Sequence, residues 1–121
     1  MTFWKSLGTC VLASLALAMP AAKAQDIVVG QVAPLSGVLG STGAQMVLGG
    51  RIYFDHINSK GGIHGAKIRQ VVMDDAYKVD ETVRLTQELL ARPEVVALYG
   101  FAGTANVGKL LADGVLEQGG A

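Results

Sequence analysis

Three short apolar runs alternate with longer segments of helical periodicity, and this order limits the fold more than any other feature. The runs "IVVGQVA" (27–33), "AKIRQVVM" (66–73) and "VVALY" (95–99) are rich in β-branched residues, which indicates strands. Residues 44–58 and 79–92 repeat apolar side chains at helical spacing, and a third helix follows the last strand. Right-handed connections then predict an α/β fold, a doubly wound parallel sheet built as βαβαβα in the order 2-1-3.

The helical periodicity also predicts which side chains turn towards the sheet. These positions are Val47, Gly50, Phe54 and Ile57 in the first helix, Val83, Thr86 and Leu90 in the second, and Val107, Leu111 and Val115 in the third. In a sheet of this order, the chain reverses direction between the first and third strands. Ligands bind outside the carboxyl ends of the strands at such a switch point, so the Gly-rich loops "PLSGVLGSTG" and "GFAGTANVG" are expected to border a binding crevice.

The second of these loops contains an incomplete phosphate-binding pattern. Gly103 to Lys109 fits the first seven positions of G-x-x-x-x-G-K-[ST], but the eighth is Leu110, which cannot ligate the magnesium ion of a nucleotide site. A helix N-terminus that follows a strand still presents free N–H groups and the positive end of the helix dipole. We therefore expect a small anion here rather than a nucleotide, with Lys109 directed to solvent.

Other reactive side chains do not form a recognisable catalytic or metal-binding pattern. Adjacent strand residues point to opposite faces, so Asp74 and Asp75 are expected to be strand-end caps and solvated acids. His56 and His64 lack a second ligand at metal spacing and are expected to be exposed. With no Gly-x-Ser-x-Gly or His–Glu zinc motif, the sequence predicts no catalytic residue, no metal and no cofactor.

The N-terminal residues have the pattern of a secretory signal peptide. A cation at Lys5 precedes the uncharged stretch 6–19, and "AKA" at 22–24 predicts a signal peptide over residues 1–24 with cleavage between Ala24 and Gln25. Cleavage removes the only cysteine and two of the ten Lys and Arg residues, so the mature net charge is 8 − 10 = −2. A slightly acidic chain without basic clusters is a poor candidate for nucleic-acid binding.

The mature segment 25–121 is expected to be the N-terminal part of a larger domain, because "LLADGVLEQGGA" has the pattern of a helix followed by the usual entry to another strand. Four motifs at fixed spacing carry a family likeness. They are "PLSG" at Pro34 to Gly37, "INSKGGIHG" at Ile57 to Gly65, "DDA" at Asp74 to Ala76, and "GFAGT" at Gly100 to Thr104. Together they resemble the type I periplasmic solute-binding proteins of branched-chain amino-acid (leucine/isoleucine/valine) ABC importers.

The resemblance implies two α/β lobes around a hinge, of which this chain is an incomplete first lobe. It implies a small-molecule partner, an amino acid or related carboxylate, and delivery of that ligand from the periplasm to an ABC permease in the inner membrane. The full-length protein is expected to be a monomer that binds without catalysis. A ligand-sensing domain with the same fold is the alternative, and an enzyme is a third possibility.

The resemblance also assigns candidate ligand-binding residues. The Thr104 hydroxyl and the backbone of Ala102, Gly103 and Ala105 correspond to the carboxylate-binding loop. The loop after the first strand is expected to cover the ligand near Leu39, Ser41 and Thr42. Many members of the family carry an aromatic residue where this sequence has Thr42. Two alternatives follow: Phe101 supplies the missing surface, or the ligand is not a branched-chain amino acid.

Overall fold

The structure is a computed structural model that describes residues 24–119, so the predicted signal peptide lies, apart from Ala24, outside the described residues. The elements are β1 (Ile27–Ala33), the 3-10 helix η1 (Gly37–Leu39), α1 (Gly40–Ser59), β2 (Ile68–Asp74), α2 (Val79–Leu90), β3 (Val95–Leu98), α3 (Thr104–Ala112) and the 3-10 helix η2 (Leu116–Gly119). Over this part of the chain, the predicted alternation of strands and helices is confirmed. No helix within 24–119 has both the length and the apolarity needed to span a bilayer.

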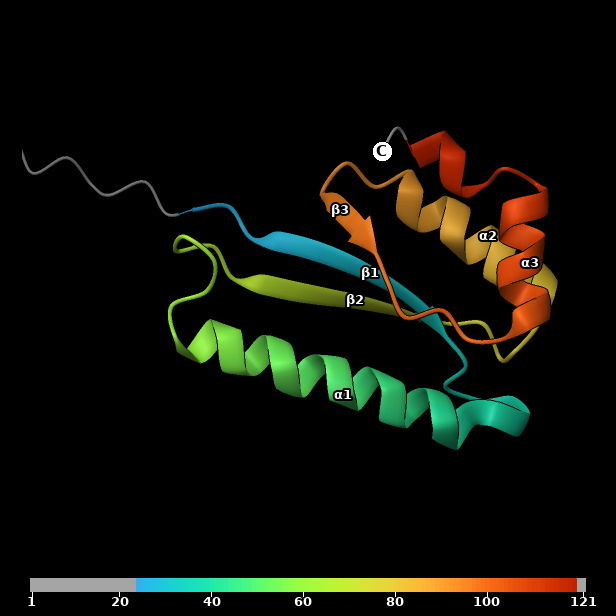
Figure 1. Ribbon diagram of the computed structural model, residues 1–121, viewed down its shortest axis with the longest axis horizontal. Helices are drawn as coiled ribbons and strands as arrows, with labels where there is room; N and C mark the ends of the chain where they lie inside the picture. The colour runs from blue at the N-terminus through green and yellow to red at the C-terminus, as the bar shows by residue number, and fades with distance from the viewer. Residues whose placement is uncertain (1–23, 120–121) are drawn as a thin grey trace, which may run out of the picture.

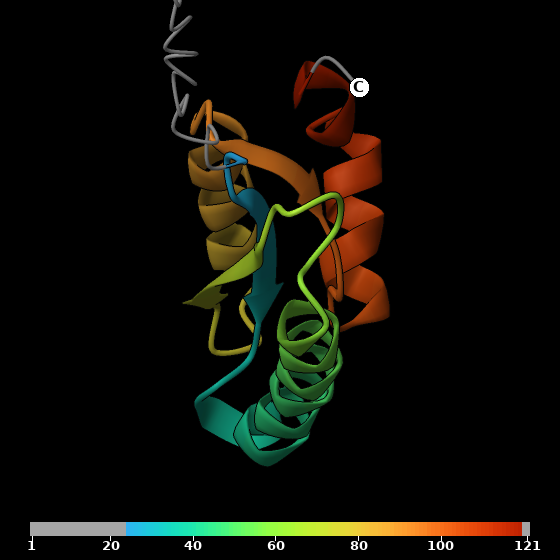
Figure 2. The ribbon, with the colours of Figure 1, turned by 90° about the vertical axis from the view of Figure 1, so that its left-hand side faces the viewer.

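The three strands form one parallel sheet in the order β2-β1-β3, which confirms the predicted order. β1 pairs with β2 along its whole length, from Ile27 opposite Ile68 to Ala33 opposite Asp74. α1 lies along one face of the sheet, and α2 lies on the other with α3 packed beside it (Figure 1). The sheet separates α1 from α2 in the view of Figure 2. The carboxyl ends of β1 and β3 therefore form the predicted switch point.

The apolar core lies between the sheet and α2. Val32 of β1 and Leu85 and Leu89 of α2 form its buried centre, around which partly buried apolar side chains pack. Those side chains are Val71, Met73, Val95, Leu98 and Phe101. Burying an aliphatic side chain contributes about 1.5–3 kcal/mol to the free energy of folding. This core holds α2 on the sheet, and α2 in turn supports α3.

α1 is longer than predicted at its N-terminal end. It begins at Gly40 rather than at residue 44, because the η1 turn leads directly into its first turn. Glycines disfavour a helix, so the pattern of residues alone predicts a later start, whereas packing of Gly43 against Pro34 holds the first turn in place. The inward positions of this helix are confirmed, since Val47 is buried and Gly50, Phe54 and Ile57 are half-buried.

The predicted inward faces of α2 and α3 need correction. In α2 the buried residues are Thr82, Leu85, Thr86 and Leu89, so only Thr86 of the predicted stripe is fully buried. In α3 the buried residues are Asn106 and Leu110, whereas Leu111 is 63% exposed. Val115, after the helix, is buried as predicted. The physical reason is that threonine and asparagine occupy inward positions here, where their polar groups find hydrogen-bond partners.

Candidate functional site

The loop after β1 forms one side of the switch point. Pro34 is buried, Leu39 of η1 is half-buried, and Ser41 and Thr42 are exposed in the first turn of α1. The exposed hydroxyls of Ser41 and Thr42 therefore lie at a helix N-terminus at the carboxyl end of β1 (Figure 1). That these residues cover the ligand stays a prediction.

The loop after β3 leads directly into the N-terminus of α3. Gly103 is the residue before the helix, with φ of 97° and ψ of 125°, and Thr104 is the first helical residue. The first N–H groups of an α-helix have no partner within the helix, and in α3 no capping side chain accepts them. Thr104 and Ala105 are exposed and Ala102 is half-buried, which leaves the hydroxyl and the N–H groups accessible to an anion.

A hollow of about 430 Å³ lies against this helix, lined by Gly103, Thr104, Val107, Gly108 and Leu111. None of the predicted residues from the loop after β1 lines it. Of the predicted carboxylate-binding residues, Gly103 and Thr104 border this hollow at the start of α3.

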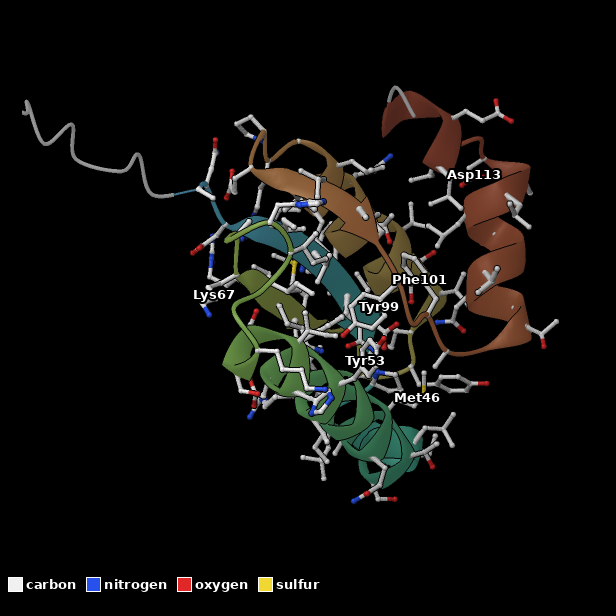
Figure 3. The ribbon with its side chains drawn as sticks, turned by 60° about the vertical axis from the view of Figure 1, so that its left-hand side comes forward. Met46, Tyr53, Lys67, Tyr99, Phe101 and Asp113 are labelled. Carbon is white, nitrogen blue, oxygen red and sulfur yellow. The ribbon has the colours of Figure 1, made fainter. Side chains whose placement is uncertain are left out.

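Phe101 lies beside the apolar core. The residue is half-buried and packs against the core cluster centred on Val32, Leu85 and Leu89. Its side chain is labelled in Figure 3. This ring is used for packing on the α2 face of the sheet. That Phe101 supplies the surface missing at Thr42 stays a prediction.

Two neighbouring side chains, Leu110 and Lys109, show how the end of the incomplete phosphate-binding pattern is placed. Leu110 is fully buried, and the Lys109 ammonium lies 2.7 Å from an Asp113 carboxylate oxygen on the exposed side of α3. The prediction that Lys109 points to solvent is confirmed. Within residues 24–119, no three His, Cys, Asp or Glu side chains are grouped in a way that could hold a metal ion.

Asp74 links the turn after β2 to the loop after β1, a role that sequence analysis did not identify. Its Oδ1 accepts hydrogen bonds from the backbone N–H groups of Leu35 (2.8 Å), Ser36 (3.2 Å) and Ala76 (2.8 Å). Hydrogen bonding by the Ser36 hydroxyl and by these N–H groups lowers the pKa of the Asp74 carboxyl. The predicted role as a strand-end cap is confirmed for this exposed acid.

Asp75 is not the solvated acid that the sequence predicted. It is 1% exposed, and its Oδ2 accepts a hydrogen bond from the Thr82 hydroxyl at 2.5 Å. Asn106 Nδ2 donates to the same Thr82 oxygen at 2.7 Å. A buried carboxyl group is costly unless it is hydrogen-bonded, and here the Thr82 hydroxyl of α2 and the Tyr77 N–H of the preceding turn are its partners. The signal that was missed is the placement of Thr82 and Asn106 among the inward positions of their helices.

The two residues after this acid pair have strained backbones. Ala76 and Tyr77 have φ values of 48° and 62°, a left-handed conformation that costs side-chain-bearing residues roughly 1–2 kcal/mol each. Asp74 and Asp75 stabilise it by accepting the N–H groups of Ala76 (2.8 Å) and Tyr77 (2.9 Å). A Cβ built on Gly103 would lie 2.7 Å from Tyr77 Cε2, so the tyrosine ring sits directly against the loop that precedes α3.

A second polar cluster lies on the α1 face of the sheet. Gln31 donates to the Gly100 carbonyl at 3.1 Å, and Gln70 donates to Gln31 Oε1 at 2.8 Å and to the Tyr99 hydroxyl at 2.5 Å. Burial raises the pKa of Tyr99. This cluster fixes the start of the loop after β3 from beneath. Its signal in the sequence is the glutamine in the middle of the apolar run "IVVGQVA".

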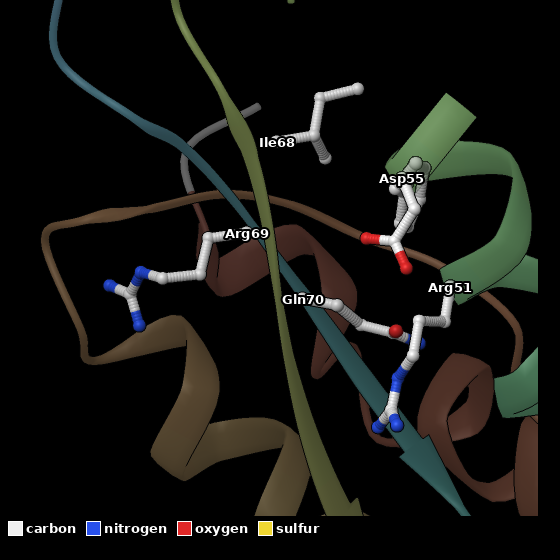
Figure 4. Close-up of a pocket in the computed structure, with 6 residues that line it drawn as sticks. Arg51, Asp55, Ile68, Arg69 and Gln70 are labelled. Atoms are coloured by element: carbon white, nitrogen blue, oxygen red, sulfur yellow. The ribbon is translucent and has the colours of Figure 1, made fainter. Parts of the chain in front are cut away.

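A smaller hollow of about 240 Å³ lies between α1 and the edge strand β2 (Figure 4). Its lining residues are Arg51, Phe54, Asp55, Ile68, Arg69 and Gln70. The Asp55 carboxylate and the Gln70 amide point towards one another, while Arg69 points away (Figure 4). Gln70 Oε1 is buried without a hydrogen-bond partner among the described residues. This hollow is separate from the switch point.

Comparisons with known proteins give one consistent result. Residues 26–118 match the family model of the periplasmic binding proteins. The chain is similar to a Leu/Ile/Val-binding protein, BraC3, of Rhizobium johnstonii, with 44% identity over 86 residues, which is 71% of this chain and 23% of that protein. It is also similar to an amino acid binding protein of Pseudomonas aeruginosa, with 33% identity over 75 residues, which is 62% of this chain and 20% of that protein.

Two solved structures share the fold. A substrate-binding periplasmic protein from Ralstonia solanacearum superposes with a TM-score of 0.76 at 44% identity, covering 78% of this chain and 27% of that one. A branched-chain amino acid transporter substrate binding protein from Streptococcus pneumoniae, in complex with isoleucine, superposes with a TM-score of 0.68 at 27% identity, covering 75% of this chain and 26% of that one. The chain thus spans about a quarter of the length of these relatives.

Proposed function

The chain belongs to the periplasmic binding protein family, and from this premise we propose that it binds an amino acid or similar small carboxylate as the solute-binding component of an ABC importer. The supporting observation is the uncapped N-terminus of α3, where the Thr104 hydroxyl and the first N–H groups of the helix are accessible together. A carboxylate suits this position because it accepts several such hydrogen bonds and is attracted by the helix dipole.

The choice of an amino acid follows from the relatives. One is named a Leu/Ile/Val-binding protein, and a structural neighbour is a complex with isoleucine. The described residues offer donors for the carboxylate end, from Thr104, Ala105 and the adjoining backbone. We propose that Leu39, Ser41 and Thr42 cover the ligand from the loop after β1, and that the ligand leaves unchanged.

The ammonium end of the ligand needs acceptors that we propose lie in a second lobe. Residues 25–121 correspond, in this proposal, to the N-terminal part of the first lobe of a two-lobe protein that is monomeric at full length. We propose that the full-length protein delivers this ligand to a permease in the inner membrane. Export through a signal peptide cleaved between Ala24 and Gln25 completes the proposal, and mass spectrometry of the periplasmic protein tests it. An intact Met1 would contradict it.

The decisive experiment compares two substitutions on α3 in the natural protein at its full length. Thr104→Ala removes a hydrogen bond to a charged group, which contributes about 1.5–3 kcal/mol, so affinity should fall roughly 10- to 100-fold. Lys109→Ala is the matched control, because Lys109 pairs with Asp113 on the exposed side of the helix.

Calorimetric titration with L-leucine, L-isoleucine and L-valine measures both variants. Little change for Lys109→Ala and a large loss for Thr104→Ala agree with the proposal. The opposite ranking would favour a phosphate ligand, and wild-type protein that binds none of the three amino acids would refute the proposed ligand class.

A further inference from the structure

Three fully buried polar side chains connect the end of β2, the helix α2 and the helix α3. Asp75, Thr82 and Asn106 are 1%, 0% and 1% exposed. The Thr82 hydroxyl accepts from Asn106 Nδ2 at 2.7 Å, and its oxygen lies within hydrogen-bond distance of two acceptors, Asp75 Oδ2 at 2.5 Å and the Lys78 carbonyl oxygen at 3.0 Å. The amide nitrogen of Asn106 can only donate, so the hydroxyl accepts from it and offers its own proton to those acceptors. Thr82 therefore joins Asp75 to Asn106.

The hydrogen bonds that link Asp75, Thr82 and Asn106 reach the first turn of α3, the helix whose N-terminus is the proposed anion site. Asn106 is the third residue of α3, two residues after Thr104. α3 has nine residues, no side-chain cap and no acidic residue in its first turn. Isolated helices of this length are marginal in water, so tertiary contacts must decide where the N-terminus lies. The buried amide of Asn106 is such a contact, because leaving it without a hydrogen-bond partner inside the protein would destabilise the fold.

The same carboxylate also fixes a second contact to the helix start. Asp75 Oδ1 accepts the Tyr77 N–H at 2.9 Å and so supports the left-handed backbone of Tyr77, whose φ is 62°. The Tyr77 ring lies against Gly103, the residue immediately before the helix. One oxygen of Asp75 thus acts on the loop through Tyr77, and the other acts on the first helical turn through Thr82 and Asn106.

We infer that Asp75, Thr82, Asn106 and Tyr77 are positioning residues for ligand binding, which hold the N–H groups and hydroxyl at the start of α3 in place without touching the ligand. This inference rests on the proposed function of the α3 N-terminus. Its physical basis is pre-organisation, because donors held rigidly in the bound geometry lose less entropy when the ligand arrives. Disrupting the buried chain must then weaken carboxylate binding, even though the altered residue lies beneath the site.

The test uses the natural protein at its full length, with L-leucine and L-isoleucine as probes. Thr82→Val keeps the side-chain shape but removes the hydroxyl that joins Asp75 to Asn106. Thr82→Ser keeps the hydroxyl. Thr86→Val is the matched control: Thr86 is equally buried one turn further along α2, but its hydroxyl donates only to the Thr82 backbone carbonyl, at 2.6 Å.

Calorimetry well below the melting temperature of each variant separates positioning from general destabilisation. Thr82→Val should lower affinity roughly tenfold, whereas Thr82→Ser and Thr86→Val should remain within about twofold of wild type. Equal losses for Thr82→Val and Thr86→Val, or no loss for Thr82→Val, would overturn the inference while wild-type binding still upholds the proposed function. Wild-type protein that binds neither probe would refute the proposed function and the inference with it.

Discussion

Gly103 is the position where backbone strain, side-chain packing and the candidate site meet, so Gly103→Ala should have a large effect on stability. The residue has φ of 97°, a region that L side chains rarely adopt, and occupying it costs roughly 1–3 kcal/mol. The new Cβ would also lie 2.6 Å from Asn106 Oδ1 and 2.7 Å from Tyr77 Cε2. Asn106 must then move, which breaks its hydrogen bond to Thr82 inside the protein.

The expected cost follows from adding these effects. Loss of a buried hydrogen bond contributes about 1–3 kcal/mol, so together with the backbone term Gly103→Ala should lower the free energy of unfolding by about 2–6 kcal/mol. That is a large share of the roughly 5–15 kcal/mol that stabilises an ordinary protein domain. The same substitution at Gly108, also in α3, meets no atom within 4 Å and should add up to about 1 kcal/mol of helix stability.

Urea unfolding followed by circular dichroism measures both variants against wild type, with the midpoint and the slope compared. An unchanged slope shows that the variants unfold from the same kind of native state. If Gly103→Ala is as stable as wild type, or at least as stable as Gly108→Ala, the explanation given for this loop is refuted.

Four further substitutions test other parts of the fold. A Cβ on Gly43 would overlap the Pro34 carbonyl, so Gly43→Ala should cost about 3 kcal/mol or more in urea unfolding, and an unperturbed midpoint would contradict the packing at the start of α1. Leu110→Ala should lower the free energy of unfolding by about 2–5 kcal/mol because Leu110 is fully buried. Leu111→Ala, at a 63% exposed position, should change it by less than about 0.5 kcal/mol. Thermal melts that reverse this ranking would show that Leu111 lies on the inward face of α3, as its periodicity predicted. The pKa of Asp74 is lowered below 3.8, so its carboxylate stabilises the fold fully above that pH and stops doing so as the pH falls through the lower, folded-state pKa. Asp74→Asn should therefore have a lower free energy of unfolding than wild type at neutral pH, and this difference should become smaller in acid. A difference in stability that does not change with pH would refute the role of the charge.

The candidate site could be located from the sequence but not described from it. Topology placed it at the carboxyl ends of β1 and β3, and the pattern around Gly103 indicated a helix N-terminus suited to an anion. The predicted inward face of α3 was wrong, because the prediction considered only apolar residues as inward-facing. Asn106 takes an inward position since Thr82, on another helix, accepts its hydrogen bond.

What the sequence by itself determined is the order of elements, the parallel sheet with β1 in the middle, and the solvent-exposed position of Lys109. These features follow from side-chain periodicity and the handedness of connections, which act over a few neighbouring residues. Only the tertiary structure decided that Asp75 is buried, that Phe101 belongs to the core and that Tyr77 packs on Gly103. Each of these depends on partners that come from separate elements, and the energetic cost of burying a polar group or a ring is known only when those partners are in place.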